Sequence, residues 1–220
     1  MKRLIDIVLA GVMLLLGLPL MLVATIGIKL NSPGPILYHA TRVGMEGKSF
    51  TMFKFRSMHV SSHKSTGAVI TVPDDKRIFQ FGKILRKTKV DELPQLLNVL
   101  LGSMSLVGPR PEDPKIVEIY YTDWMKYTLS VRPGITSPGA IFYYGVGEEL
   151  IKEDDPEGSY ATMLLPPKIA IERAYLERAN WLSDLVCIGH TALAVLGAMT
   201  NRSVLPLSRD RKAALKWVRN

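Results

Sequence analysis

Cysteine and histidine are scarce in this 220-residue chain. The single cysteine, Cys187, excludes an intramolecular disulfide and is typical of a reducing compartment. His59 and His63 are four residues apart, but the helix of a zinc protease requires a glutamate directly after the first histidine, and none follows His59. The sequence also contains no internal repeat and no low-complexity tract. These absences exclude a disulfide-stapled fold and a zinc protease, and the length fits one sizeable domain.

The balance of charge is strongly basic, with 28 Lys and Arg against 20 Asp and Glu, a net charge of +8. Such a balance favours an anionic partner, which could be a nucleic acid, an anionic lipid or a phosphorylated substrate.

Charged residues are absent between Ile7 and Ile28. These 22 residues would span about 33 Å as a straight helix, enough to cross a bilayer. Pro19 lies near the middle, where a proline removes a backbone hydrogen bond and normally kinks a helix. Because Ala24-Thr25-Ile26 is a poor signal-peptidase site, we expect the segment to be retained.

Basic residues flank this apolar segment on both sides, with Lys2 and Arg3 before it and Lys29 after it. A simple crossing would place one basic flank outside the cell, against the positive-inside tendency. A helix bent at Pro19 that enters and leaves by the cytoplasmic face keeps both flanks inside, although a broken helix needs support for its free backbone groups. The residues alone leave both topologies open.

A β-hairpin is predicted after the turn at 31–35, with strands at 36–43 and 50–58. On the second strand Lys54 and Arg56 share a face, because side chains alternate along a strand. A Lys/Arg pair of this kind could hold a diphosphate, and a solvated strand face is an equally good interpretation.

Two adjacent carboxylates, Asp91 and Glu92, follow a run of basic residues and precede an apolar helix. The basic run consists of Arg77, Lys83, Arg86, Lys87 and Lys89. The pattern predicts Asp91 as the N-cap of that helix, with Pro94 in its first turn. Carboxylates at a helix N-terminus among cations suit phosphate chemistry, whereas a capping box on a surface helix is the simpler local interpretation.

Three further helices are predicted, over residues 115–126, from Pro166 to about Asn180, and over 181–200. The last is interrupted by Asp184 and His190, so we expect an amphipathic helix in preference to a second crossing. Arg110 stands between two prolines that would restrict its backbone.

The apolar N-terminal segment, the second predicted strand, the acidic pair with its flanks and the segment around Arg110 together resemble the small monotopic phosphoglycosyl transferases of the bacterial sugar transferase family. The resemblance rests on KRLIDIVLA at 2–10, KFRSM at 54–58, GKILRKTKVDELPQLLNVLLGSMSLVGPRP at 82–111 and VRPGIT at 131–136, with a weaker match at about 168–200. It departs in two places: Leu18-Pro19 stands where the family commonly has Ser-Pro, and Ser137-Pro138-Gly139-Ala140 replaces a Gly-Trp-Ala-Gln segment.

The resemblance implies an α+β, mainly helical fold with a re-entrant membrane helix (1–31), a catalytic domain (32–200) and a basic tail (201–220). That domain would carry a small β-hairpin, with amphipathic interfacial helices around the catalytic pair. It implies an enzyme on the cytoplasmic face of the bacterial inner membrane that uses Mg²⁺. The enzyme would transfer a sugar-1-phosphate from a UDP-sugar to a polyprenol phosphate such as undecaprenyl phosphate. No nucleic-acid partner is expected.

The resemblance also assigns roles, with Asp91 and Glu92 catalytic and Asp91 the nucleophile that forms an aspartyl-phosphosugar and releases UMP. Asp91 is in addition the expected metal ligand, since Mg²⁺ prefers carboxylate and phosphate oxygens. The expected substrate-binding residues are Lys54, Arg56, Arg86, Arg110 and Arg132.

Two alternatives remain. A membrane-tethered protein that binds anionic lipid or nucleic acid explains the charge, but acids within the basic run would weaken its binding. A one-step transferase would bind donor and acceptor together, with Asp91 or Glu92 as general base.

Overall fold

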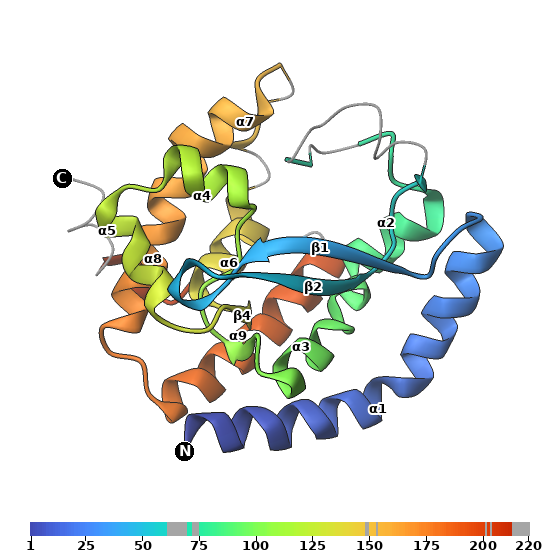
Figure 1. Cartoon of the computed structure of the whole chain (residues 1–220), viewed down its shortest axis with the longest axis horizontal. Helices are drawn as coiled ribbons and strands as arrows, with labels where there is room; N and C mark the ends of the chain where they lie inside the picture. The colour runs from blue at the N-terminus through green and yellow to red at the C-terminus, as the bar shows by residue number, and fades with distance from the viewer. Residues whose placement is uncertain are drawn as a thin grey trace.

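The computed structural model describes residues 1–60, 70–71, 75–147, 150–152, 154–200, 202 and 204–212. The fold is mainly helical with a small β-hairpin, as predicted, and the hairpin β1–β2 crosses the middle of the molecule (Figure 1). Half of the predicted basic tail, residues 201, 203 and 213–220, lies outside the described residues.

Helix α1 (Lys2–Asn31) contains the whole apolar segment, with Pro19 inside it. The helix runs along one side of the molecule and bends upward in its second half (Figure 1). The bend agrees with the predicted effect of a proline, which leaves one carbonyl of the preceding turn without its amide donor.

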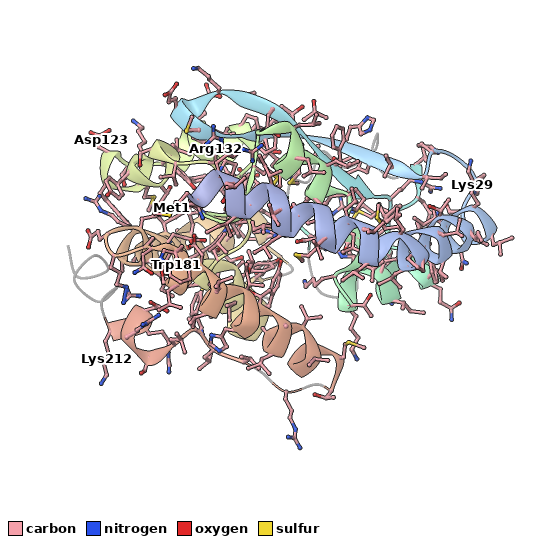
Figure 2. The ribbon with its side chains drawn as sticks, turned by 90° about the horizontal axis from the view of Figure 1, so that it is seen from below. Met1, Lys29, Asp123, Arg132, Trp181 and Lys212 are labelled. Atoms are coloured by element: carbon pink, nitrogen blue, oxygen red, sulfur yellow. The ribbon has the colours of Figure 1, made fainter. Side chains whose placement is uncertain are left out.

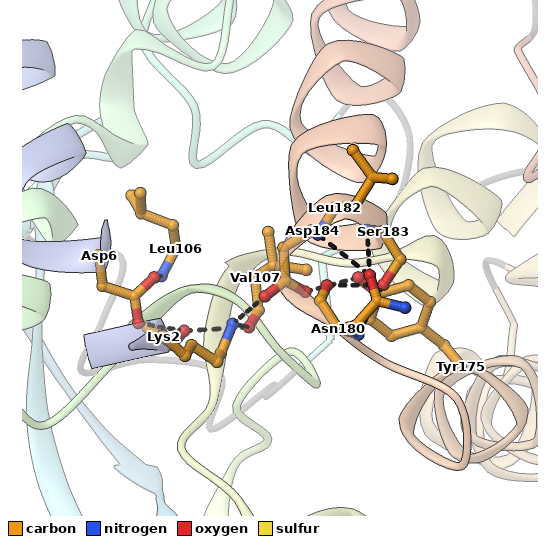
Figure 3. Close-up of polar contacts among 10 residues, drawn as sticks. Lys2, Asp6, Leu106, Val107, Tyr175, Asn180, Leu182, Ser183 and Asp184 are labelled. Atoms are coloured by element: carbon orange, nitrogen blue, oxygen red, sulfur yellow. Dashed lines mark hydrogen bonds and ion pairs between the residues drawn. The ribbon is translucent and has the colours of Figure 1, made fainter. Parts of the chain in front are cut away.

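The N-terminal end of α1 is attached to the rest of the chain by polar contacts. Lys2 forms an ion pair with Asp184 (2.5 Å) and also donates to the Val107 carbonyl, while the buried Asp6 carboxylate accepts from the Leu106 amide (Figure 3). Arg3 donates to two backbone carbonyls at 99 and 100.

The C-terminal end of α1 is attached by apolar packing. Ala24 and Ile28 are fully buried in a cluster with four residues from other elements, namely Phe55, Phe79, Leu85 and Val90. Both ends of one helix therefore contact the same folded body.

The predicted hairpin is confirmed as β1 (Leu37–Val43) and β2 (Ser49–Phe55), which pair antiparallel from Leu37↔Phe55 to Val43↔Ser49. The short helix η1 (Met45–Gly47) joins them, and Gly47 takes a positive φ of 74° that suits glycine. Strand β2 ends three residues earlier than predicted, so Arg56 lies beyond the strand.

The predicted N-cap role of Asp91 is wrong. After α2 (Gln80–Lys87) the chain forms a 3₁₀ turn, η3 (Val90–Glu92), and α3 (Gln95–Leu101) begins only after its N-cap, Pro94. Pro94 has no amide hydrogen to bond the Val90 carbonyl, which instead accepts from Leu93. The two acids therefore lie in a turn between two helices.

The polar side of α3 faces inward. Asn98 is buried, accepts from the Phe53 amide and donates to the Thr51 carbonyl, which fixes α3 to β2. Leu97 and Leu101 are exposed instead.

A parallel pair that the sequence did not predict joins β3 (Ser105–Val107) to β4 (Gly134–Thr136). Gly108 and Gly134 touch at this pair: a Cβ added to Gly134 would lie 2.1 Å from the Gly108 nitrogen. The loop that follows β3 carries Arg110.

The helix predicted at 115–126 is two helices, α4 (Pro114–Tyr120) and α5 (Asp123–Lys126), because the chain is extended at Tyr121 and Thr122. The remaining elements are η4 (Tyr127–Ser130), α6 (Pro138–Phe142), η5 (Tyr143–Gly147), α7 (Pro156–Ser159), η7 (Tyr160–Leu164), α8 (Leu165–Leu176) and α9 (Trp181–Met199). Elements η5 and η7 are π-helical turns.

Within the described residues, α1 and α9 are the two helices that are long and apolar enough to cross a membrane. They lie on the same face, with Met1 near Trp181 and Lys29 at the far end of α1 (Figure 2). Many of their leucines are exposed, among them Leu15, Leu16, Leu22, Leu193 and Leu196. This face is far more apolar than the surface of an ordinary soluble domain.

Candidate active site

The acidic pair lies in η3, where three elements meet. Residues of β2, α2 and α1 pack against the turn, and both Asp91 and Glu92 are buried. Lys89, directly before the turn, takes a positive φ of 58°, which ends α2 and redirects the chain. A strained, non-glycine residue beside two buried carboxylates is typical of a functional site.

Glu92 is held by cations on both of its oxygens. Arg110 donates to Oε1 at 2.5 Å and to Oε2 at 3.2 Å, and the Lys54 ammonium lies 3.3 Å from Oε1. The forked contact with Arg110 is the strong bidentate geometry of guanidinium and carboxylate. Glu92 therefore has its hydrogen-bonding capacity largely filled by the protein.

Asp91 differs from Glu92 in that one of its carboxylate oxygens is not hydrogen-bonded by the described residues. Its Oδ1 atom is buried and has no hydrogen-bond partner among the described residues. The positive charges of Lys54, Arg86 and Lys89 all act on this carboxylate. A buried oxygen without a donor is costly in a folded protein, and such an atom calls for a ligand, an ion or a water as its partner.

The pKa values of the two neighbouring carboxyls are shifted in opposite directions. Burial raises the pKa of Asp91, an effect to which Glu92 adds and which the nearby cations reduce. Burial also acts to raise the pKa of Glu92, but the charges of Arg110 and Lys54 outweigh it and hold that pKa well below its usual range. Glu92 therefore keeps its charge to lower pH than an ordinary glutamate, whereas Asp91 takes up a proton at higher pH than an ordinary aspartate.

Three of the five predicted substrate-binding residues act on this pair. Lys54 and Arg110 contact Glu92, and the charge of Arg86 acts on Asp91. Burial lowers the pKa of Lys54, against the attraction of Glu92. About a fifth of the Arg110 and Lys54 side chains stays exposed, so both remain accessible to a bound anion.

Arg56 and Arg132 do not join this group. The Arg56 side chain is buried and donates to the Pro35 carbonyl at 2.6 Å and to the Ser32 hydroxyl and carbonyl at 2.6 and 2.7 Å. Arg132 is exposed and donates to the carbonyl of Gly102, at the end of α3 away from the acids. The proposed pairing of Lys54 and Arg56 on one strand face is not formed, because β2 ends before Arg56.

Tyr144 was not predicted as a site residue, yet its hydroxyl accepts from Arg110 Nη1 at 2.9 Å. The Lys89 ammonium lies 3.6 Å from the centre of its ring. The sequence feature that points to this region is the departure from the family pattern at 137–140. These residues begin α6, which leads directly into the turn that carries Tyr144.

No cluster of three or more His, Cys, Asp or Glu side chains that could hold a metal ion occurs among the described residues. Of the acidic pair, Asp91 offers a buried carboxylate oxygen that has no hydrogen-bond partner among the residues that the structure describes. A metal held here would need most of its ligands from substrate and water, a pattern that suits Mg²⁺ better than a dedicated protein cage.

An apolar face and an acidic pair set among cations define a membrane-associated protein with a site suited to a phosphorylated ligand. The sequence model of the bacterial sugar transferase family matches residues 1–198. The chain belongs to this family.

Curated relatives support the assignment. The chain is 37% identical over 203 residues to the "UDP-glucose:undecaprenyl-phosphate glucose-1-phosphate transferase" of Xanthomonas campestris pv. campestris, a match that covers 90% of this chain and 39% of that protein. It is 36% identical over 197 residues to the Caulobacter vibrioides protein of the same name, covering 89% of this chain and 69% of that protein.

A third relative carries another sugar in its name. The "UDP-N-acetylgalactosamine-undecaprenyl-phosphate N-acetylgalactosaminephosphotransferase" of Aeromonas hydrophila is 43% identical over 137 residues, covering 61% of this chain and 32% of that protein. The chain thus spans well under half the length of the Xanthomonas and Aeromonas relatives.

Proposed function

We propose that this protein transfers a sugar-1-phosphate from a UDP-sugar to undecaprenyl phosphate or a similar polyprenol phosphate. The observation that carries the proposal is the unequal state of two adjacent carboxylates. Glu92 is saturated by Arg110 and Lys54, whereas Asp91 lies among cations and presents a buried oxygen that has no hydrogen-bond partner in the described part of the chain. The family and the names of its relatives supply the substrate class.

In the proposed first step a carboxylate oxygen of Asp91 attacks the sugar-linked phosphorus of the donor. The bond from that phosphorus to the bridging oxygen breaks, and UMP leaves with this oxygen. In the second step a phosphate oxygen of the polyprenol phosphate attacks the same phosphorus and releases the Asp91 carboxylate. The product is a polyprenyl diphosphate sugar, and an ionised Asp91 needs no base for its attack.

Arg110, Lys54 and Arg86 stabilise the charge of the donor diphosphate in this scheme. Arg110 and Lys54 are fixed by Glu92, so they need little reorganisation when charge develops on the phosphorus oxygens. The role of Glu92 is therefore to hold these two cations in place.

The residues present fit a Mg²⁺ ion held by Asp91 together with the donor's phosphates. When bound, such an ion supplies neutralisation of diphosphate charge close to the carboxylate. In its absence Asp91 would face the repulsion of the diphosphate with the protein's cations alone.

The membrane arrangement belongs to the same proposal: α1 enters and leaves by the cytoplasmic face of the inner membrane without crossing it. At about 1.5 Å per residue its 30 residues measure about 45 Å, longer than a bilayer core. Two contacts support a re-entrant path, because Lys2 pairs with Asp184 and Ile28 packs against Phe55 of the same domain. A spanning helix would separate these ends by the membrane.

The exposed leucines of α1 and α9 would then insert into the lipid and place the acidic pair at headgroup depth. There a polyprenol phosphate can reach Asp91 while its chain stays in the bilayer. The names of the relatives divide between glucose and N-acetylgalactosamine, and the donor sugar of this chain is to be found by experiment.

The test is a product assay with the full chain in detergent or nanodiscs. Undecaprenyl phosphate, Mg²⁺ and a panel of UDP-sugars are supplied, and UMP and the lipid diphosphate sugar are measured by mass spectrometry. We expect equimolar UMP and lipid product with at least one donor and none with Asp91→Asn. Folded protein that makes no product from any donor, or an Asp91→Asn variant of normal activity, would overturn the proposal.

A further inference from the structure

Tyr144 completes a closed set of polar contacts with Glu92 and Arg110. Its hydroxyl accepts from Arg110 Nη1 at 2.9 Å and lies 3.5 Å from Glu92 Oε2, to which it donates. The same Nη1 atom donates to Glu92 Oε2 at 3.2 Å. Each of the three side chains thus touches the other two.

Tyr144 reaches the site through an unusual turn of the backbone. Ser137 caps α6 by accepting from the Ala140 amide, and the chain then widens from α-helix to the π-helical turn η5. A π turn adds a residue per turn and so rotates the side chains that follow it, a device common at functional sites. An uninterrupted α-helix would direct residue 144 elsewhere.

The turn is held from behind by the C-terminal segment. A Cβ added to Gly145 would lie 2.6 Å from the Val204 carbonyl oxygen, so the two backbones are in contact. In front, the Lys89 ammonium sits over the Tyr144 ring, a cation–π contact from the residue that precedes the acidic turn. The Val204 contact therefore holds the backbone of the turn, the Lys89 contact holds the ring, and the hydroxyl reaches Arg110 and Glu92.

The chemistry of the hydroxyl suits a constant role. Burial raises the pKa of Tyr144 far above its ordinary value, so the group stays protonated and can donate and accept at once. Arg110 must serve two anions in the proposed reaction, Glu92 and the donor phosphate. A neutral partner on Nη1 can hold the guanidinium without competing for its charge.

We infer that Tyr144 is a positioning residue of the transferase, whose hydroxyl fixes the orientation of Arg110 between Glu92 and the donor diphosphate. The inference rests on the proposed function and adds to it a residue outside the short sequence segments on which the resemblance rests. It also gives the segment at 137–147 a role at the catalytic pair.

Tyr144→Phe in the full chain tests the inference, because it removes the hydroxyl and keeps the ring under Lys89. We expect kcat to fall by about tenfold, the effect of one hydrogen bond to a charged group, with the KM for UDP-sugar changed less than about twofold. The control is Tyr120→Phe, whose hydroxyl donates to Glu157 at 3.2 Å on the surface. This variant should retain wild-type kinetics, and all variants should share one melting temperature.

A double-mutant cycle separates positioning from a merely structural role. In an Arg110→Lys background the bidentate fork is gone, so Tyr144→Phe should cost less than about twofold. Losses of kcat that multiply in the double variant, or a wild-type kcat in Tyr144→Phe, would overturn the inference. The proposed function would still stand in either case, because the wild-type protein would remain an active transferase. A wild-type protein without transferase activity would instead overturn the proposed function.

Discussion

Asp91 and Glu92 are neighbours in the chain, yet their surroundings give them different chemistry. Glu92 exchanges water for a bidentate guanidinium and an ammonium, which compensates its burial. Asp91 is equally buried, with one oxygen unpartnered among the described residues. A nucleophile needs an available oxygen, and a residue that holds cations needs its oxygens filled. The contacts therefore assign the two roles.

The pH dependence of turnover should depend on Lys54. Asp91 reacts as a carboxylate, so activity is present above its pKa and is lost as pH falls through it; burial puts this loss at a higher pH than for an ordinary aspartate. Lys54 is the cation that most lowers this pKa. Lys54→Met should therefore move the acid limb of kcat to higher pH.

The matched control for this profile is Lys48→Met, which removes an exposed lysine paired with Glu46. Its acid limb should coincide with that of the wild type. An unshifted limb in Lys54→Met, or a shift to lower pH, would contradict the electrostatic account of Asp91.

Arg110→Lys tests the guanidinium directly. Lysine keeps the charge but cannot donate to both oxygens of Glu92 from one planar group, so kcat/KM should fall at least about tenfold, or about 1.4 kcal/mol. Steady-state kinetics at saturating lipid acceptor give the value. Wild-type kcat/KM in a variant of unchanged melting temperature would reduce Arg110 to a loop residue.

Among the elements, the end of α1 is joined to the hairpin by Arg56. Its guanidinium satisfies the Ser32 and Pro35 carbonyls where the chain leaves the helix. Arg56→Met keeps the length and removes these donors, which should destabilise the protein by about 2–4 kcal/mol and lower the melting temperature. The exposed pair Lys126–Asp123 supplies the control: Lys126→Met should leave the melting temperature unchanged. Equal melting temperatures for both variants would be inconsistent with a structural Arg56.

Some of these elements could be predicted from the sequence and others could not. Alternation and turn residues predicted the hairpin, and the long apolar run with its proline predicted a bent helix, because these signals are local. The N-cap at Asp91 was wrong because the capping pattern is also met by a 3₁₀ turn before Pro94. The β3–β4 pair joins residues nearly 30 positions apart through two glycines, and no local pattern records such a contact.

In the candidate site too, residues marked by a local sequence signal could be predicted, and residues placed by long-range contacts could not. The acidic pair and Arg110 could be found from the chain, since charge and proline mark them. Arg56 was misplaced because the strand was predicted to run three residues past its end at Phe55, whereas Arg56 lies beyond the strand and donates to loop carbonyls. Tyr144 was missed because a π-helical turn brings it to Glu92 from 52 positions away.

At the scale of the whole molecule, both ends of α1 should lie on the cytoplasmic side. Single cysteines at positions 2 and 31, in a Cys187→Ser background, can be probed in intact cells with a membrane-impermeant maleimide. Neither should react until the cells are opened, after which both should. A cysteine placed in a known periplasmic loop of another protein is the positive control. Labelling of either position in intact cells would contradict the re-entrant arrangement.

The order of chemistry is the most direct test of the central claim. Enzyme, the active UDP-sugar and Mg²⁺ are mixed without polyprenol phosphate, and UMP is followed by rapid quench. A covalent route through Asp91 predicts a burst that approaches one UMP per active site, with a phosphosugar left on the protein, and no burst from Asp91→Asn. Wild-type enzyme that turns over with both substrates, yet releases no UMP until the polyprenol phosphate is added, would contradict the account.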